Sequence, residues 1–174
     1  MLKMALVVLI LALAVGAAYA KPAGTIDQFG VGAYFLTDKT PAFDPNTGWA
    51  VNYFHLAERN WYTSVEVGHY SATIHFTPVA GEASSAAADV TTWLATIGRA
   101  IRTSDGKTYV GLGVGYLVDD DVNLGHGVRF ETDGRIGWEI VAGTVRAPLG
   151  VQVRYHDGRM APNRGVTASL TYSW

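Results

Sequence analysis

The sequence has no cysteine, and this absence removes several kinds of chemistry at once. Disulfide cross-links, thiol nucleophiles and thiolate metal ligands are all excluded. A nucleophile elbow of the Gly-x-Ser-x-Gly type is also missing, and the glycine-rich segment at residues 111–115 lacks the following helix pattern that a phosphate-binding loop requires. We therefore predict a protein that has no cofactor and gains its stability without cross-links.

Charge is scarce and nearly balanced, with 13 Lys and Arg against 15 Asp and Glu and a formal net charge of -2. The chain contains no run of basic residues. Nucleic acids are bound mainly through dense basic surfaces, so we expect no nucleic-acid partner.

The sequence does not indicate a metal site either. The densest acidic segment, Asp119-Asp120-Asp121 followed by Asn123, carries ligands that suit a hard cation such as calcium, but the glycine and glutamate of an EF-hand are absent. His69 and His75 share a face of one predicted strand, yet they would lie roughly 20 Å apart, too far for one ion. We interpret the acidic segment as a solvated loop and predict no bound metal.

Long hydrophobic runs are limited to one, at residues 6–13. The run follows Lys3 and precedes the small-x-small sequence Ala18-Tyr19-Ala20, the arrangement of a cleavable export signal. The alternative, a transmembrane anchor, needs roughly 20 apolar residues and is disfavoured by this shorter run. The expected organisation is a signal peptide at residues 1–20 and one domain at residues 21–174.

Glycine and large aromatic residues are abundant, with 20 Gly, 9 Tyr and 5 Trp. This composition is typical of transmembrane β-strands, where aromatic side chains lie at the membrane interfaces and small residues relieve crowding inside. Apolar and polar residues also alternate with a period of two. In residues 164–174, Val166 and Leu170 fall on one face while Thr167 and Ser169 fall on the other. A period of two indicates strands with two different faces.

We predict an all-β fold, an eight-stranded antiparallel transmembrane up-and-down β-barrel. The predicted strands cover residues 28–37, 48–57, 61–76, 90–102, 109–118, 127–140, 149–156 and 164–174. Short turns, at Glu58-Arg59-Asn60, Ser104-Asp105-Gly106-Lys107 and Ala142-Gly143-Thr144, alternate with longer connections such as residues 78–89. Such barrels keep their short turns in the periplasm, so we expect the bacterial outer membrane as the location.

The alternation also assigns an inside to the barrel. The three glycines of residues 111–115 share one face, which suits a narrow lumen. Arg135, Glu139 and Arg154 fall on inward positions, where an isolated charge would be costly, so we expect these three side chains to pair across the lumen. His156 is also predicted to face inward.

The segment GVQVRYHDGRMAPNRGVTASLTYSW at residues 150–174, together with Gly134-Arg135-Ile136-Gly137, resembles the lipid A 3-O-deacylases, also described as acyloxyacyl hydrolase-like proteins. The resemblance covers residues 107–174. It implies an eight-stranded outer-membrane barrel that binds or hydrolyses the lipid A of lipopolysaccharide through a serine activated by a histidine. A last strand that ends in an aromatic residue, here Trp174, resembles the signal that the barrel-insertion machinery recognises.

His156 is the candidate catalytic residue that this resemblance implies. It matches the family's histidine after a shift of one residue, and Gly158 then stands where the family has its serine. Without the shift, Tyr155 and Asp157 occupy these two positions. In the predicted register Tyr155 faces lipid and His156 faces the lumen, whereas an acyl chain approaches the barrel from outside.

Four interpretations of the function follow. The first is a deacylase-like barrel, and the second is a non-enzymatic barrel with a structural, adhesion or surface-binding role. A narrow channel is disfavoured because side chains fill the interior of eight strands. A soluble barrel would place its apolar residues inward, and the terminal aromatic residue and the glycine-rich second face argue against it.

In bacteria that express the chain, the protein should be recovered with the outer membrane. Before heating it should migrate on a denaturing gel at a position different from that after heating, because a barrel embedded in lipid keeps its fold in detergent. Recovery in the soluble periplasm would contradict the barrel prediction.

Overall fold

The computed structural model describes residues 24–37, 43–76, 84–119, 122–123, 129–130, 134–145, 148–158 and 164–174. The predicted signal peptide at residues 1–20 lies outside these ranges. Within them, no helix has the length and apolar character needed to cross a membrane.

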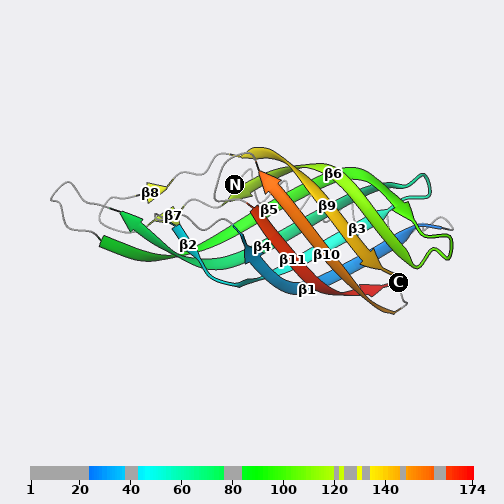
Figure 1. Ribbon diagram of the computed structural model, residues 1–174, viewed down its shortest axis with the longest axis horizontal. Coiled ribbons are helices and arrows are strands. Elements are labelled where there is room, and N and C mark those ends of the chain that lie inside the picture. Colours follow the sequence, from blue (N-terminus) through cyan, green and yellow to red (C-terminus); the bar gives the residue numbers. More distant parts are fainter. Residues whose placement is uncertain are drawn as a thin grey trace.

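Eight long strands form a closed antiparallel barrel (Figure 1). They are β1 (Ile26–Leu36), β3 (Gly48–Leu56), β4 (Trp61–Phe76), β5 (Ser84–Arg102), β6 (Thr108–Asp119), β9 (Arg135–Thr144), β10 (Leu149–Gly158) and β11 (Arg164–Ser173). Each long strand pairs with the next along the chain, and β1 pairs with β11 to close the sheet. The predicted eight-stranded up-and-down barrel is confirmed.

Two short additions lie at one end of this barrel. The strand β2 (Phe43–Pro45) pairs with β4, and β7 (Val122–Asn123) pairs with β8 (Arg129–Phe130). Both additions follow the strands that lead into the longer connections, so they enlarge that end of the molecule and leave the barrel wall unchanged.

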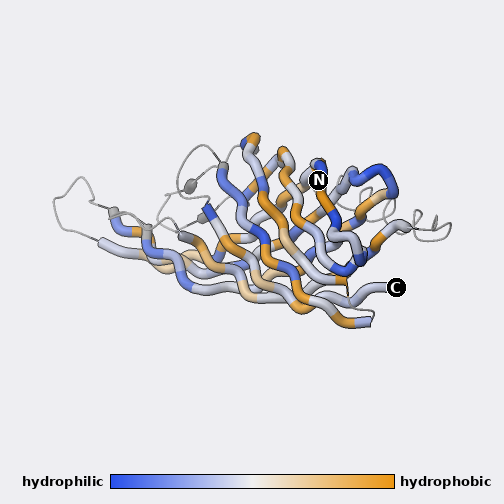
Figure 2. Tube along the Cα trace, turned by 45° about the vertical axis from the view of Figure 1, so that its right-hand side comes forward, coloured by the Kyte–Doolittle hydropathy of each residue, from blue (hydrophilic) through white to orange (hydrophobic). Residues whose placement is uncertain are grey.

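The barrel wall has an apolar outer face and a more polar inner face. On β6, the side chains of Val110, Leu112 and Val114 are exposed, whereas the glycines between them are buried on the lumen side. Figure 2 shows hydrophobic and hydrophilic segments interspersed along the barrel strands. Soluble barrels bury their apolar residues, so this arrangement is the one expected for a barrel surrounded by lipid.

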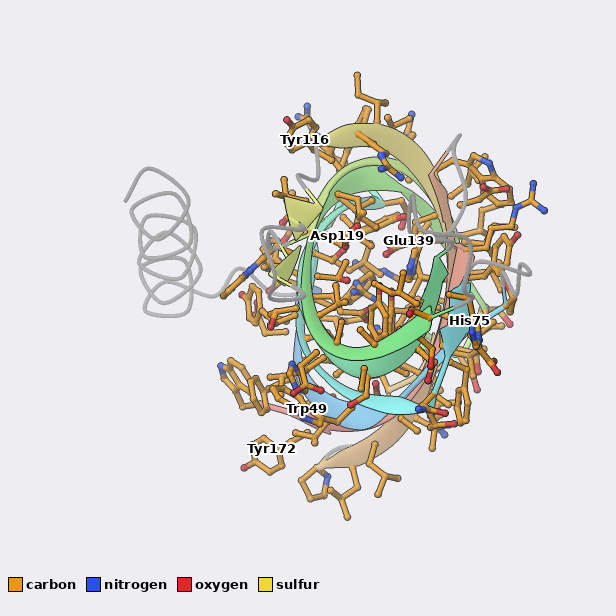
Figure 3. All side chains as sticks on the ribbon, turned by 90° about the vertical axis from the view of Figure 1, so that its left-hand side faces the viewer. Trp49, His75, Tyr116, Asp119, Glu139 and Tyr172 are labelled. Carbon is orange, nitrogen blue, oxygen red and sulfur yellow. The ribbon has the colours of Figure 1, made fainter. Side chains whose placement is uncertain are left out.

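Aromatic side chains form two belts on the outer surface. Toward the longer connections, the ring centroids of Trp138 and Tyr155 lie 5.2 Å apart. Toward the short turns, those of Tyr53 and Trp174 lie 6.4 Å apart. Viewed along the barrel in Figure 3, aromatic side chains from both belts point outward, among them Trp49, Tyr116 and Tyr172. Paired belts of this kind mark the two interfaces of a membrane-spanning barrel.

The short turns gather at one end of the barrel, where the chain also ends (Figure 1). In the turn between β5 and β6, Gly106 has a φ of 67°, which glycine adopts without strain. The Asp105 carboxylate accepts hydrogen bonds from the Thr103 hydroxyl at 2.5 Å and from the Lys107 backbone N–H at 3.0 Å. These two hydrogen bonds hold the pKa of the Asp105 carboxyl below its usual value. The predicted tight turn is confirmed.

The predicted start of β5 is wrong, because the strand begins at Ser84 and not at residue 90. Residues 84–89 are small or polar, and we predicted them as part of a loop. They are extended because β4 continues to Phe76 and pairs with them residue by residue. A neighbouring strand with free backbone groups can therefore outweigh weak strand propensity.

The predicted bounds of β9 are also wrong at both ends. The strand begins at Arg135 and continues through Ala142-Gly143-Thr144, which we predicted as a turn. β6 supplies pairing partners to the end of this segment. A Cβ at Gly143 would lie 2.4 Å from the Tyr109 hydroxyl oxygen, so the glycine makes room for that ring inside the barrel.

Two facing glycines make room for a second lumen tyrosine. Gly98 on β5 and Gly113 on β6 are direct cross-strand partners. A Cβ at Gly98 would lie 2.5 Å from Cε1 of Tyr62, and a Cβ at Gly113 would lie 2.4 Å from its hydroxyl oxygen. The glycine-rich inner face predicted for β6 is therefore the space that the buried Tyr62 ring occupies.

The substitution Gly113→Ala should lower the free energy of unfolding by about 1–3 kcal/mol, because the added methyl group would overlap the Tyr62 hydroxyl. Urea unfolding of the refolded barrel in lipid vesicles, followed by tryptophan fluorescence, measures the change. Val114→Ala changes the adjacent outward position and is the matched control. An equal loss in both variants would show that lumen crowding is not the cause.

Candidate functional site

The lumen is filled by side chains in three layers, with a polar layer between two apolar clusters. The cluster toward the longer connections contains Tyr34, Ala50, Tyr70, Ala72, Ile74, Ala88 and Val90. The cluster toward the short turns contains Ile26, Phe54, Leu56, Tyr62, Ala100, Tyr109 and Val141. Figure 3 shows side chains across the whole lumen, with Glu139 among them. A filled interior of this kind does not favour the channel interpretation.

An ionic cluster of three side chains lies in the polar layer. Arg154 on β10 is only 1% exposed, and its Nη1 lies 3.4 Å from Oε2 of Glu66 and 3.8 Å from Oε2 of Glu139. The Thr167 hydroxyl donates to Oε1 of Glu66 at 2.8 Å, and the Tyr62 hydroxyl donates to Oε1 of Glu139 at 3.2 Å. Strands β4, β9, β10 and β11 each contribute at least one of these groups, so the cluster connects opposite parts of the wall.

Burial makes the three charges depend on one another. Removing a charged group from water costs several kcal/mol, roughly, and is offset only where opposite charges and hydrogen-bond donors are close. Here one guanidinium stands between two carboxylates, and hydroxyl groups donate to both carboxylates. Loss of the cation alone would leave two buried carboxylates without compensation.

A second polar network connects β1 and β11, the two strands that close the barrel, to β6 and β10. Nε2 of Gln28 donates to the Ser173 hydroxyl at 3.1 Å, and Oε1 of Gln28 accepts from the Tyr109 hydroxyl at 2.6 Å. Nε2 of Gln152 donates to the same Tyr109 oxygen at 2.6 Å. β1, β6, β10 and β11 therefore share one chain of hydrogen bonds inside the lumen.

His156 lies inside the barrel, as the alternation predicted, and is 2% exposed. Its Nε2 lies 3.0 Å from the Tyr34 hydroxyl, and the two rings stack with centroids 5.6 Å apart. Gly165 on β11 is the close neighbour on another side, since a Cβ there would lie 2.6 Å from Cε1 of His156. In the part of the chain that the structure describes, no serine hydroxyl is hydrogen-bonded to either ring nitrogen.

The structure brings two of the three predicted lumen residues together. Glu139 and Arg154 lie together, with Nη1 of Arg154 3.8 Å from Oε2 of Glu139, whereas Arg135 is partly exposed at the start of β9. Arg135 lies four residues before Glu139 on the same strand, which separates the two by roughly 13 Å. Glu66 is a further member of the cluster that we did not predict, although its inward position follows from its alternation with Tyr62 and Ser64 on β4.

The acidic segment is only partly described, since Asp120 and Asp121 lie outside the described residues. Asp119 is 5% exposed and accepts a hydrogen bond from the Thr92 hydroxyl at 2.8 Å. It therefore faces the lumen and is not part of a solvated loop, contrary to our interpretation of this residue. Among the described residues, no group of three or more His, Asp and Glu side chains is arranged to hold a metal ion.

Comparisons with known proteins reveal relatives in structure only. No family model matches the sequence, and no curated protein matches it. The outer-membrane protein Ail of Yersinia pestis, in a phospholipid nanodisc, superposes with a TM-score of 0.52 and 10% identity, covering 86% of this chain and 99% of Ail. Neisserial surface protein A superposes with a TM-score of 0.49 and 14% identity, covering 87% of this chain and 96% of that protein.

The likeness to Ail shows the fold and not the activity, because the sequences are so different. The chain has the fold of the small outer-membrane β-barrels. Its apolar outer face and its two aromatic belts are the independent physical signature of a barrel that spans a membrane. Together these findings identify a barrel of the bacterial outer membrane.

The substitution Arg154→Met should lower the free energy of unfolding by about 3–5 kcal/mol, because it leaves two buried carboxylates without their cation. Urea unfolding in lipid vesicles measures the loss. Adding Glu66→Gln and Glu139→Gln to the same chain should recover most of it.

Arg164→Met is the control for loss of an arginine. Arg164 is 54% exposed and its Nε lies 3.2 Å from Oδ2 of Asp157, so its removal should cost about 0–1 kcal/mol. Equal losses for Arg154→Met and Arg164→Met would contradict the role assigned to the buried cluster.

Proposed function

We propose that this protein is a non-enzymatic outer-membrane barrel that presents a small rigid sheet, formed by parts of β2, β4 and β5, for binding at the cell surface. The support is one observation: β4 and β5 continue together beyond the barrel wall. The pairing of β3 with β4 ends at Trp49 and His69, and the pairing of β5 with β6 ends at Thr92 and Asp119. Figure 1 shows the extension at the end opposite the short turns.

The extension, which consists of β2, residues 70–76 of β4 and residues 84–90 of β5, is a hydrogen-bonded sheet. Residues 70–76 of β4 pair with residues 84–90 of β5, and β2 pairs with β4 on its other edge. On the inner side, Tyr70, Ala72 and Val90 are buried in the apolar cluster that covers this end of the lumen. The sheet is thus anchored on the barrel through its inner side, which leaves the outer side available.

The outer side of the extension differs from the outer side of the barrel. Beyond His69 the outward positions of β4 carry polar side chains, and the Ser71 hydroxyl donates to Oδ1 of Asp89 at 2.6 Å. A polar outer side does not suit lipid, so this sheet stands clear of the membrane. Because the short turns of such barrels are periplasmic, the extension lies on the extracellular side.

The resemblance to lipid A 3-O-deacylases stays a prediction, and the position of His156 gives it little support. Its Nε2 already contacts Tyr34, its ring is buried in the lumen, and Gly158 stands where the family has its serine. A non-enzymatic role needs none of these groups to reach a lipid.

Replacing residues 71–89 with Asn-Gly should abolish surface binding without unfolding the barrel, because the new turn joins Tyr70 and Val90, which are direct cross-strand partners. Bacteria that express the full chain should adhere to cultured epithelial cells more than bacteria that express the shortened chain. Heat-modifiable gel migration confirms that both barrels fold. Lys107→Gln, in a periplasmic turn, is the control, and adhesion that survives the replacement would contradict the proposal.

Lipid A from bacteria that express the chain should have an unchanged mass spectrum, because no serine among the described residues is hydrogen-bonded to His156 and its ring is buried in the lumen. The control is lipid A from bacteria that express His156→Ala. If the unsubstituted chain removes a 3-hydroxyacyl group and His156→Ala does not, the protein is a deacylase and the non-enzymatic proposal fails.

A further inference from the structure

One charged side chain lies on the lipid-facing surface of the barrel near its periplasmic end. Arg99 occupies an outward position of β5, and its outward neighbours Ile97 and Ile101 are 57% and 79% exposed. On β6 its cross-strand partner is Leu112, which is 61% exposed. A guanidinium therefore interrupts an apolar surface that faces acyl chains.

The guanidinium of Arg99 is held in place by two contacts. Its Cζ lies 5.1 Å from the ring centroid of Trp61, which is its cross-strand partner on β4, and its Nη2 donates to the backbone carbonyl of Arg59 at 3.3 Å. Among the described residues, no carboxylate forms an ion pair with it. A guanidinium has five N–H donors, so most of its donors remain available to an anion.

The other charged groups at this end do not neutralise Arg99. The Arg102 guanidinium donates to the backbone carbonyls of Gly24, Leu56 and Ala57. The Asp105 carboxylate accepts from the Thr103 hydroxyl and from the Lys107 backbone N–H. Glu58 is exposed in the turn before β4, and its electrostatic interaction is with Arg102.

We propose that Arg99 binds the phosphate group of a phospholipid in the periplasmic leaflet. The site combines a cation at the level of an interfacial tryptophan with an apolar surface, formed by Ile97 and Leu112, along which the acyl chains lie. A guanidinium can donate two parallel hydrogen bonds to phosphate oxygens, and the contact with the Trp61 ring fixes the orientation of the Arg99 guanidinium. Arginine near a membrane surface attracts lipid phosphate because the surrounding dielectric is low.

The simplest alternative is that Arg99 extends into periplasmic water, as long basic side chains near an interface commonly do. The contact with Trp61 argues for the lipid, because it keeps the charged group beside the barrel wall. The two alternatives predict different behaviour toward a lipid with a phosphate and a lipid without one.

The test is native mass spectrometry of the full chain refolded in detergent, with three probes. Dioleoyl phosphatidylglycerol carries phosphate and acyl chains, dioleoylglycerol carries the chains alone, and glycerol 3-phosphate carries the phosphate alone. The chain should retain one phosphatidylglycerol and neither of the other two. Arg99→Gln should weaken retention about fivefold, and Arg99→Lys should retain the lipid at an intermediate level.

Arg164→Gln is the matched control, because it removes the same charge from a guanidinium at the other end that is paired with Asp157. It should retain phosphatidylglycerol as the unsubstituted chain does. Equal retention by Arg99→Gln and the unsubstituted chain would overturn the proposal. Retention of dioleoylglycerol or glycerol 3-phosphate as strongly as the phospholipid would also overturn it.

Discussion

Eight strands enclose a lumen that is only as wide as the side chains inside it, and this width determines most of the structure. No bulk water can hydrate an inward polar group, so each group depends on its neighbours for hydrogen bonds and opposite charge. Arg154 lies beside the opposite charges of Glu66 and Glu139, and Gln28 forms hydrogen bonds with hydroxyl groups. The apolar clusters at both ends then separate this polar layer from solvent.

The outer surface faces lipid along the barrel wall and water along the extension, and its residue types change where the surroundings change. Along β4 the outward positions are apolar or aromatic at Trp61, Val65 and Val67, and become polar beyond His69. The inner positions of the same strand remain packed to the end of the extension at Ile74. One part of β4 is thus exposed to lipid and the next part to water, while the inner face packs against the interior as far as Ile74. The proposed surface-binding sheet is a direct extension of the membrane-spanning wall.

The features that depend only on the alternation of residues along each strand could be predicted from the sequence. The inward position of His156 and the outward position of Tyr155 follow from counting by twos, and so does the strand count. Alternation cannot tell which inward residues meet, because that depends on how far each strand is staggered around the closed barrel. Glu66 contacts Arg154 across a separation of 88 residues, and no local pattern indicates this pairing. Strand ends were missed for a similar reason, since Ser84 is extended only because β4 lies beside it.

The joining of β1 to β11 has a consequence for the route by which the chain folds. Gln28 and Ser173 are 145 positions apart, yet they share a hydrogen bond at the seam. Contacts so distant along the chain close slowly, because a long loop must be ordered before they form. Until the last strand docks, β1 and β10 each present an open row of backbone donors and acceptors, which is a template for joining another chain. The final strand therefore decides whether this chain becomes a closed monomer or the start of an aggregate.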